Sequence, residues 1–128
     1  MAAFTERELA YLSSQPLMRF ASASPTGRPD VAAVGFSVDG DDIVTAGFDI
    51  TKTVRYRNIA ANPTAAVVID DLAATDPWTP RGIKVRGRVR IEDDGAGQRF
   101  RITPEVIWSW GVNDPKDGIP AIERRIVP

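Results

Sequence analysis

Residues 51–58, with the sequence TKTVRYRN, hold charged and hydroxyl side chains at a spacing that suits phosphate binding. A helix that begins here would point its free amides and the positive end of its dipole at one place. Lys52, Thr53 and Arg55 add two positive charges and a hydroxyl near that place. The pattern therefore predicts a phosphate site. The structural alternative is a Thr-capped amphipathic helix with a basic exposed face.

Residues 82–92 (GIKVRGRVRIE) alternate between apolar and basic side chains, as expected of a strand with two unlike faces. Gly87 interrupts the apolar face, which indicates a bulge or a close approach of two backbones. The basic face is either solvated or lines an anionic groove. Single-stranded nucleic acid binding would need aromatic side chains among these charges, and the sequence places none there, so we expect no nucleic-acid partner. The apolar face carries Ile83, Val85, Val89 and Ile91. The basic face carries Lys84, Arg86, Arg88 and Arg90.

Three tryptophans are large residues for a domain of this size. Trp108 and Trp110 stand two apart in an expected strand, so they share one side of it. They could fill the core, form a dimer interface or make a wall for ring stacking, and their position near the chain end favours the interface. Trp78, close to Arg81, lies in the proline-containing segment 73–80, which we expect to be a loop. There Trp78 either contributes to a site or caps one end of a barrel.

The chain contains no cysteine and no histidine, and this limits the chemistry that its own side chains can perform. A disulfide framework, a thiol nucleophile, thiolate or imidazole metal sites and a Ser-His-Asp triad are all excluded. Asp70, Asp71 and Asp76 lack the spacing of a calcium loop and suit turns and caps, so no metal site is expected. An enzyme of this composition would take its chemistry from a bound cofactor.

The length of 128 residues suits one domain with one core. A deep private cavity for a large cofactor is hard to build at this size, so a site shared between two subunits is the easier arrangement. The 16 basic and 17 acidic residues give a net charge of −1, which provides no general attraction for nucleic acids or anionic membranes. The start of the chain (MAAFTERELAYL) lacks a signal-peptide pattern, and no apolar run reaches membrane-spanning length. We therefore expect a cytoplasmic protein without a membrane partner.

Changes of pattern divide the chain into a barrel domain, residues 1–112, and a C-terminal arm or disordered tail, residues 113–128. The second segment contains prolines and has no clear period, which leaves both alternatives open. Thr5 and Glu8 have the spacing of a capping box. This motif predicts a first helix over residues 6–14, which ends before a proline.

Short runs of β-branched and aromatic residues, separated by turn signals, predict a mostly β fold. One further helix is expected at 51–61, where the apolar spacing becomes helical. Pro104 lies in the last expected strand and marks an edge or a bend. Closure of so many strands into a barrel would remove exposed edges. The six expected strands, mostly antiparallel, are at 17–24, 30–38, 43–48, 64–72, 82–92 and 99–110.

Five stretches of the chain resemble the pyridoxamine 5′-phosphate oxidase-like split-barrel proteins, most closely the actinobacterial branch that uses the deazaflavin coenzyme F420. Each stretch alone is a weak match to the family, but the occurrence of all five in the same order along the chain is specific. The likeness extends over residues 5–112. The resemblance implies a mostly β fold, namely a six-stranded antiparallel split β-barrel of the FMN-binding type. The stretches are LSSQPL at 12–17, VGF at 34–36, RYRNIAANP at 55–63, DPWTPRG at 76–82 and IWSWG at 107–111.

The resemblance also implies a homodimer with two equivalent cofactor sites at the subunit interface. The start of the second helix would hold the phosphate end of the cofactor, and backbone groups of strand 32–36 would face its ring system. Two residues near the expected loop would complete the site, in the same chain or from the partner subunit. The implied residues are Lys52, Thr53, Arg55 and Asn58 for the phosphate end, and Ala33, Val34 and Gly35 for the ring system. The two residues near the expected loop are Trp78 and Arg81.

The chain departs from the family pattern at two places. Arg55 replaces the usual lysine, which keeps the charge and changes its geometry. A short turn at 93–98 stands where many relatives carry a helix. This turn shortens one wall of the implied site and leaves the substrate class open.

The resemblance implies an F420-dependent oxidoreductase that transfers a hydride between the deazaflavin and a small organic acceptor. The alternatives are an FMN-binding flavoprotein of the same fold and a protein that binds its cofactor without turnover. Since the chain has no histidine, proton delivery would fall to water, Tyr56 or the substrate itself. No catalytic residue is assigned on this basis.

Overall fold

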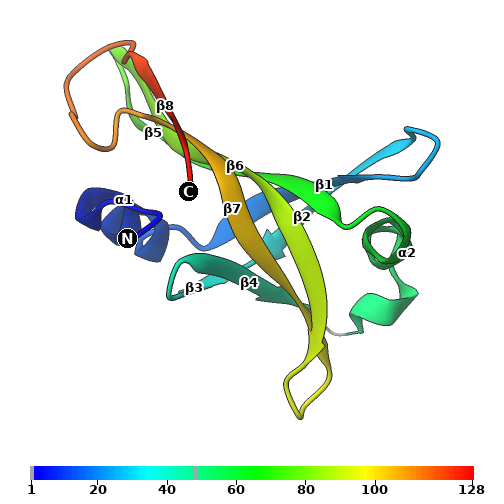
Figure 1. Cartoon of the computed structure of the whole chain (residues 1–128). Coiled ribbons are helices and arrows are strands. Elements are labelled where there is room, and N and C mark those ends of the chain that lie inside the picture. The colour runs from blue at the N-terminus through cyan, green and yellow to red at the C-terminus, as the bar shows by residue number, and fades with distance from the viewer. Residues whose placement is uncertain (1, 48) are drawn as a thin grey trace.

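The computed structural model describes residues 2–47 and 49–128, and these residues form eight strands and two α-helices (Figure 1). The helices are α1 (Glu6–Ser13) and α2 (Val54–Ala61), and a 3₁₀ turn, η1 (Ile50–Lys52), lies just before α2. Neither helix of this described part is long and apolar enough to cross a membrane. The strands are β1 (Leu17–Ala23), β2 (Pro29–Gly35), β3 (Ser37–Asp39), β4 (Asp42–Ala46), β5 (Thr64–Thr75), β6 (Trp78–Asp93), β7 (Gln98–Trp110) and β8 (Ile122–Ile126).

The described strands form one antiparallel sheet in the order β2-β1-β5-β6-β7-β4-β3, and β8 pairs with the second half of β7. The sheet curls, so that β2 and β4 approach each other although they do not pair as neighbours. The hydroxyl of Thr45 on β4 donates a hydrogen bond of 2.6 Å to the carbonyl oxygen of Gly35 on β2. The mostly β, antiparallel class predicted from the sequence is confirmed.

The described residues form eight strands instead of the six expected, for two reasons. The expected strand 30–38 divides at Phe36 into β2 and β3, because the chain leaves β1 there and turns to pair with β4. The C-terminal segment adds β8. The expected strand 43–48 ends at Ala46 as β4, and Phe48 lies outside the described residues.

The prediction of a loop at residues 73–80 is wrong, because β5 and β6 continue through this segment as one long hairpin. Asp76 and Pro77 connect the two strands. Pro80 lies opposite Leu72, next to an irregularity in the strand register. A proline lacks the N–H that a regular ladder requires, and an irregular position tolerates this lack. Proline content alone therefore suggested a loop where the strands are merely irregular.

Strand β6 is the central strand of the sheet, and its predicted alternation is confirmed. Ile83, Val85 and Val89 are buried and Ile91 packs partly buried against the core. The four basic side chains between them lie on the outer face, where Lys84 is half-buried and the other three are exposed. The core inside the curled sheet is completed by the buried side chains of Met18, Phe20, Ile43, Val67, Ile69, Phe100, Ile102 and Ile107.

Gly87 lies at a bulge between β6 and β7, as its interruption of the apolar face indicated. The register shifts between Arg86, which pairs with Val106, and Gly87, which pairs with Pro104. A Cβ atom built on Gly87 would lie 2.3 Å from the carbonyl oxygen of Thr103. The two backbones approach too closely here for any side chain. Pro104, which was predicted to mark an edge or a bend, lies opposite Gly87 at this register shift.

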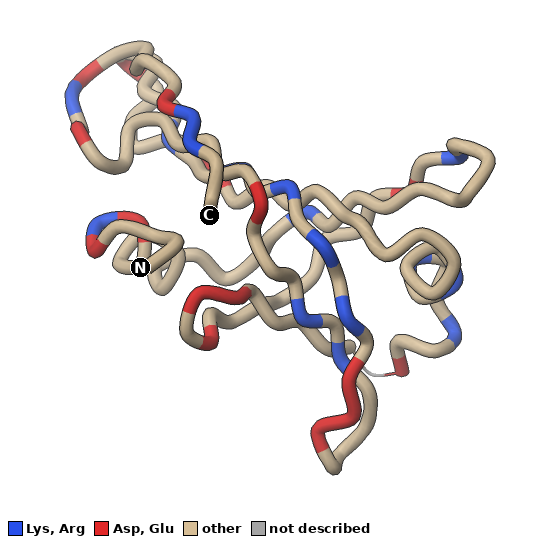
Figure 2. The backbone as a smooth tube through the Cα atoms, viewed as in Figure 1, with Lys and Arg blue, Asp and Glu red and all other residues tan. Residues whose placement is uncertain are grey.

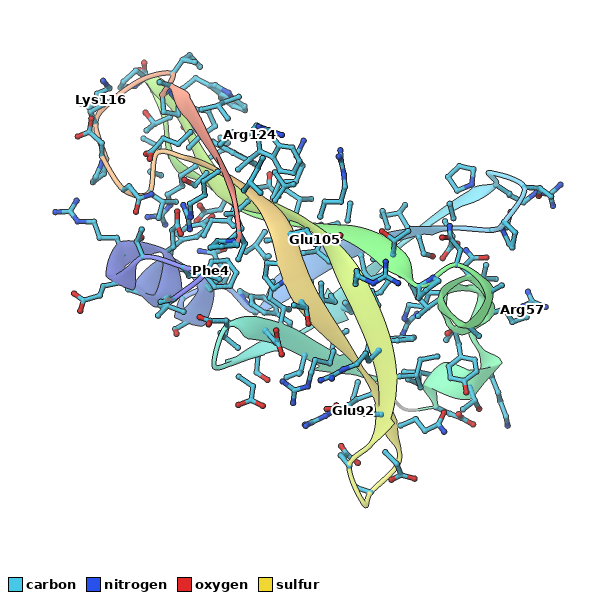
Figure 3. All side chains as sticks on the ribbon, viewed as in Figure 1. Phe4, Arg57, Glu92, Glu105, Lys116 and Arg124 are labelled. Carbon is cyan, nitrogen blue, oxygen red and sulfur yellow. The ribbon has the colours of Figure 1, made fainter. Side chains whose placement is uncertain are left out.

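The first helix begins with the predicted capping box. The Thr5 hydroxyl accepts from the Glu8 amide at 3.1 Å, and the Glu8 carboxylate accepts from the Thr5 amide at 3.0 Å. Arg125 of β8 donates to the same carboxylate and to the carbonyl oxygen of Ala3. Phe4 is buried between α1 and the sheet (Figure 3). These contacts join the first helix to the last strand.

The second helix starts later than the predicted range of 51–61. After η1, Thr53 adopts an extended conformation with φ −96° and ψ 156° and becomes the N-cap of α2. Its hydroxyl accepts a hydrogen bond of 3.2 Å from the Tyr56 amide. Arg55 remains in the first turn of the helix, as predicted.

Candidate functional site

A cleft of about 470 Å³ lies between the β4–α2 connection and the turn that joins β6 to β7. One wall includes Ala46 and Gly47, and the other includes Asp94 and Gln98. A smaller cleft of about 230 Å³ shares Ala46 and Asp94 with the first and continues to Gly35. Because the two clefts share residues, we describe them together as the β2–α2 depression, which runs from the end of β2 to the η1 turn just before α2.

The guanidinium group of Arg55 lies close to Gly47, which lines the larger cleft. The buried Nε atom of Arg55 has no hydrogen-bond partner among the described residues. A Cβ atom on Gly47 would lie 3.2 Å from an Nη atom of Arg55, so the missing side chain leaves room for the guanidinium. A buried donor without a partner costs roughly 1–3 kcal/mol. The arrangement suits an anionic ligand that accepts a charge-assisted hydrogen bond from Arg55.

Lys52 adds a positive charge near the same place, in a more exposed position. Its ammonium group lies 3.8 Å from the Asp49 carboxylate, and its side chain is 84% exposed, so this ion pair contributes little stability. Hydrogen bonds from Thr51 and the charge of Lys52 hold the pKa of Asp49 below its usual range. The carboxylates of Asp49 and Asp94 line the larger cleft and repel an anionic ligand there.

Thr53 and Asn58 make internal contacts that position α2. Besides capping the helix, the Thr53 hydroxyl donates a hydrogen bond of 2.6 Å to the carbonyl oxygen of Ile50. Asn58 is buried, and its Nδ2 atom donates to the hydroxyl of Ser22 on β1 at 3.1 Å. These are the contacts of a capped helix packed on a sheet. Through them both residues fix the position of Arg55, and a direct contact with a cofactor stays a prediction.

Strand β2 forms one end of the sheet and pairs with β1 along its length. Val34 buries its side chain in the core, whereas Ala33 and Gly35 are exposed. Apart from the Gly35 carbonyl, which binds Thr45, the outer backbone groups of β2 have no strand partner in the described part of the chain. Such an edge offers hydrogen-bonding groups to a ligand. The end of β2 opens into the depression.

Trp78 and Arg81 lie at the far end of the β5–β6 hairpin, on the opposite side of the molecule from α2 (Figure 1). Trp78 is 56% exposed. Arg81 donates two hydrogen bonds to Asp71, of 2.7 and 2.9 Å, and lies 5.1 Å from the centre of the Tyr11 ring. The hydrogen bonds from Arg81 hold the pKa of Asp71 below its usual range. One chain therefore does not bring these two residues to the depression around Arg55.

The small residues that shape the β2–α2 depression were not predicted from the sequence. Ala46 and Gly47 follow each other at the end of an expected strand, and the turn at 93–98 has the sequence DDGAGQ. Small residues at two such places are a signal for a close approach of two segments. That these two segments approach each other depends on the curl of the sheet, which pairs β4 with β7. No local pattern in the sequence carries this information.

The pyridoxamine 5′-phosphate oxidase family matches residues 4–118, which include α1, α2 and β1–β7. The chain belongs to this family. The likeness inferred from five short stretches is thus confirmed over most of the sequence.

Three individual proteins show what the chain is similar to within and beyond this family. A 5a,11a-dehydrotetracycline/5a,11a-dehydrooxytetracycline reductase from Streptomyces rimosus is 30% identical, and the match covers 92% of this chain and 91% of the relative. The solved structure of an F420 reductase is 27% identical with a TM-score of 0.62, over 76% of this chain and 93% of that one. A heme binding protein from Mycobacterium smegmatis has a TM-score of 0.73 at 13% identity, over 98% of this chain, which spans 60% of that protein. These structures confirm the split-barrel class.

Proposed function

We propose that this protein is an oxidoreductase that binds the deazaflavin coenzyme F420 and transfers a hydride between it and a small organic acceptor. The family, the 30% identity to a reductase and the likeness to an F420 reductase support this proposal. The observation that carries it is the buried Nε atom of Arg55, which lacks a partner among the described residues. A phosphate group of a cofactor would supply that partner.

In this proposal Arg55 binds the phosphate end, and Lys52 adds attraction from its exposed position. The ring system lies along the free edge of β2, where backbone groups of Ala33 and Gly35 face it, while Val34 anchors the strand in the core. The bound cofactor would supply the hydride. The chain holds it in one orientation, excludes water from one side and directs backbone amides at negative charge that develops on the acceptor.

The chain offers few groups for the accompanying proton transfer. It has no histidine, so the proton would come from water, Tyr56 or the substrate. Tyr56 is partly buried, with its ring centre 6.3 Å from that of Phe100. This contact holds the tyrosine ring in the first turns of α2, next to Arg55.

FMN is the alternative cofactor, because its phosphate and ring make the same demands on Arg55 and β2. A protein that binds either cofactor without turnover would use the same residues. Haem binding has less support, since the chain contains neither histidine nor cysteine, which are two common ligands of haem iron. The likeness to a heme binding protein at 13% identity concerns the fold alone.

We further propose that the protein is a homodimer in which Trp78 of one copy approaches the β2–α2 depression of the other. Trp78 is mostly exposed and lies far from the depression of its own chain, which supports this arrangement. The outer face of the sheet also exposes apolar side chains, among them Leu17 and Val31. Such a face suits a second copy. The small-molecule substrate would then bind between the two subunits.

Titration of the purified protein with F420 and, separately, with FMN tests the proposed cofactor. We expect F420 to bind more tightly. Reduced F420 should then be oxidised in the presence of protein and 5a,11a-dehydrotetracycline, the substrate type named for the relative from Streptomyces rimosus. Absence of binding by both cofactors would reject the proposal. Binding without oxidation by this or other electron-poor acceptors would favour a cofactor-binding protein without turnover.

A further inference from the structure

Arg99, at the start of β7, lines the smaller of the two clefts in the β2–α2 depression, and the proposed function does not use it. The same cleft includes Gly35 at the end of β2. On β4 the residue opposite Arg99 is Ala46, whose small side chain lines the cleft as well. Arg99 therefore lies at the cleft into which the end of β2 opens, and the ring system of the cofactor is proposed to bind along the free edge of that strand.

The guanidinium group of Arg99 uses only one of its three nitrogens within the chain. Its Nε atom donates a hydrogen bond of 2.7 Å to Glu92, the cross-strand neighbour on β6, and neither Nη atom forms a hydrogen bond among residues 2–47 and 49–128. Arg101, two residues further along β7, uses all three of its nitrogens on carboxylates. The Arg99 side chain is 31% exposed, against 11% for Arg101. Arg99 thus keeps two donors for a ligand, whereas Arg101 is fully engaged inside the fold.

Glu92 holds Arg99 in place from the side of β6. Its carboxylate accepts from the Nε atom of Arg99 and, at 3.1 Å from each of its oxygens, from the Nε atom of Arg101. These hydrogen bonds, with that from Arg101 the stronger, hold the pKa of Glu92 below its usual range. Glu92 is therefore charged near neutral pH and fixes one end of the Arg99 guanidinium.

The charges around this cleft nearly balance. Figure 2 shows basic positions on β6 and β7 next to the acidic positions of the turn that joins the two strands. The Asp94 carboxylate lines the cleft together with Arg99 and accepts a hydrogen bond of 2.9 Å from the Ala96 amide. Because Asp94 and Glu92 offset the charge of Arg99, a permanent anion gains little net attraction here. An oxygen that gains negative charge only during a reaction would meet fixed donors without that initial repulsion.

We propose that the two Nη groups of Arg99 donate hydrogen bonds to a carbonyl oxygen of the acceptor, on which negative charge develops during hydride transfer. This inference rests on the proposed function. When the acceptor is a double bond conjugated to that carbonyl, the hydride forms a C–H bond at the β-carbon as a C–H bond of the cofactor breaks. The electron pairs of the acceptor shift toward the oxygen, which becomes an enolate held by Arg99. Water then gives a proton to the α-carbon. The acceptor is thereby reduced by two electrons, and the reduced cofactor is oxidised and returns one proton to water.

4-Nitrophenol tests this role without turnover, because its phenolate stands for the enolate of the acceptor. Its neutral and ionised forms absorb at different wavelengths, so absorbance titrations of the protein without cofactor give the affinity for each form. We expect the natural protein to bind the phenolate about tenfold more tightly than the phenol, the contribution of a charge-assisted hydrogen bond. Arg99→Gln should lose this preference. Arg99→Lys, which keeps the charge without two parallel donors, should retain part of it.

Arg28→Gln is the matched control, because Arg28 is exposed in the turn between β1 and β2 and lines neither cleft of the depression. It should keep the preference for the phenolate to within about twofold. In the oxidation of reduced F420 by 2-cyclohexenone, Arg99→Gln should lower kcat about tenfold with little change in KM, because the charge develops after the acceptor binds. Arg28→Gln should leave both constants unchanged.

The F420 affinity of the variants distinguishes a failure of this inference from a failure of the proposed function. Arg99→Gln should bind F420 to within about twofold of the natural protein, which also shows that the variant folds. Absence of 4-nitrophenol binding, or an equal preference in Arg99→Gln and the natural protein, would overturn the inference while F420 binding stays intact. Loss of F420 affinity in Arg99→Gln with an unchanged preference would make Arg99 a cofactor contact instead. Failure of the natural protein to bind F420 would reject the proposed function, and this inference with it.

Discussion

Arg55 places a positive charge in the first turn of α2, where it opposes the positive end of the helix dipole. Its buried Nε atom also lacks a hydrogen-bond partner among the described residues. Both features are unfavourable for the protein alone, and a bound anion would compensate for both. The position of Arg55 at a helix start could be predicted because the capping signal at Thr53 is local. The orphaned donor could not be predicted, because Gly47, which lies next to the guanidinium, precedes the helix in a separate segment.

Arg55→Ala should weaken F420 binding by about 1.5–3 kcal/mol, the contribution of a charge-assisted hydrogen bond. The free energy of unfolding should stay nearly unchanged, since the substitution removes a cation that the helix dipole disfavours. Isothermal titration and chemical denaturation measure the two quantities. Lys52→Ala should have the same effect on binding but a weaker one, because an exposed, flexible ammonium holds phosphate with less definition.

Arg57→Ala is the control for this comparison, because Arg57 lies on the same helix, is exposed and points away from the molecule (Figure 3). It removes the same charge and should leave the affinity unchanged. Unchanged affinity in the Arg55 and Lys52 variants would place the phosphate site elsewhere. The basic face of α2 would then be an ordinary solvated helix face.

Glu8 should make the stability of the fold sensitive to acid. Burial alone would raise the pKa of Glu8, but hydrogen bonds from Arg125, Thr5 and Asn113 outweigh it and hold the pKa below its usual range. The stabilisation is therefore complete above the pKa of the unfolded chain, about 4.3, and is lost as the pH falls through the lower folded value. Denaturation curves at several pH values should show a smaller acid-induced loss of stability for Glu8→Gln than for the natural protein.

Glu6→Gln provides the matched comparison, since Glu6 is exposed on the same helix. Its acid dependence should follow that of the natural protein. If Glu8→Gln also follows it, the contacts of Glu8 do not favour its charged form. The interaction with Arg125 would then contribute no pH-dependent stability.

Among the elements, the β6–β7 pair requires a glycine at position 87. Gly87→Ala would bring a Cβ atom to 2.3 Å from the Thr103 carbonyl oxygen, so backbone must move. We expect a loss of roughly 2–3 kcal/mol in the free energy of unfolding, as for overpacked cores. Gly35→Ala is the control, since its nearest neighbour would be a Pro16 oxygen at 3.9 Å. Equal stability of both variants in denaturation would show that the bulge relaxes without cost.

An element was predicted correctly where the residues that signal it lie within one segment of the sequence. The alternation of residues 82–92 and the capping box at Thr5 each lie within one segment, and both were predicted correctly. The hairpin at 73–80 was missed because its prolines occupy a turn and a register irregularity, which proline content does not distinguish from a loop. Strand β8 was left undecided because its pairing needs β7 and the buried contact between Arg125 and Glu8. The walls of the β2–α2 depression likewise come from segments that only the curled sheet brings together.

For the whole molecule, the position of the depression follows from the way in which the sheet curls. Strand β2 at one end of the sheet and β4, next to the other end, approach each other through Thr45 and Gly35 without pairing, and the depression opens at this junction. The long β5–β6 hairpin extends to the other side, where it carries Trp78 away from its own depression (Figure 1). A hairpin tip of one copy can therefore serve the depression of another copy, and a two-fold dimer would do so twice.

The shared site makes a specific prediction about mixed dimers. Light scattering at micromolar concentration should give twice the mass of the 13.9 kDa chain. Arg55→Ala and Trp78→Ala should each weaken F420 binding, because each removes one contribution to both sites. When the two variants are mixed and allowed to exchange subunits, a mixed dimer regains one intact site, formed by Arg55 of one copy and Trp78 of the other. With random exchange, about a quarter of all sites should then bind F420 as tightly as the natural protein, since half of the dimers are mixed. No recovery on mixing, or a monomer mass in solution, would show that Trp78 does not serve the site of a second copy.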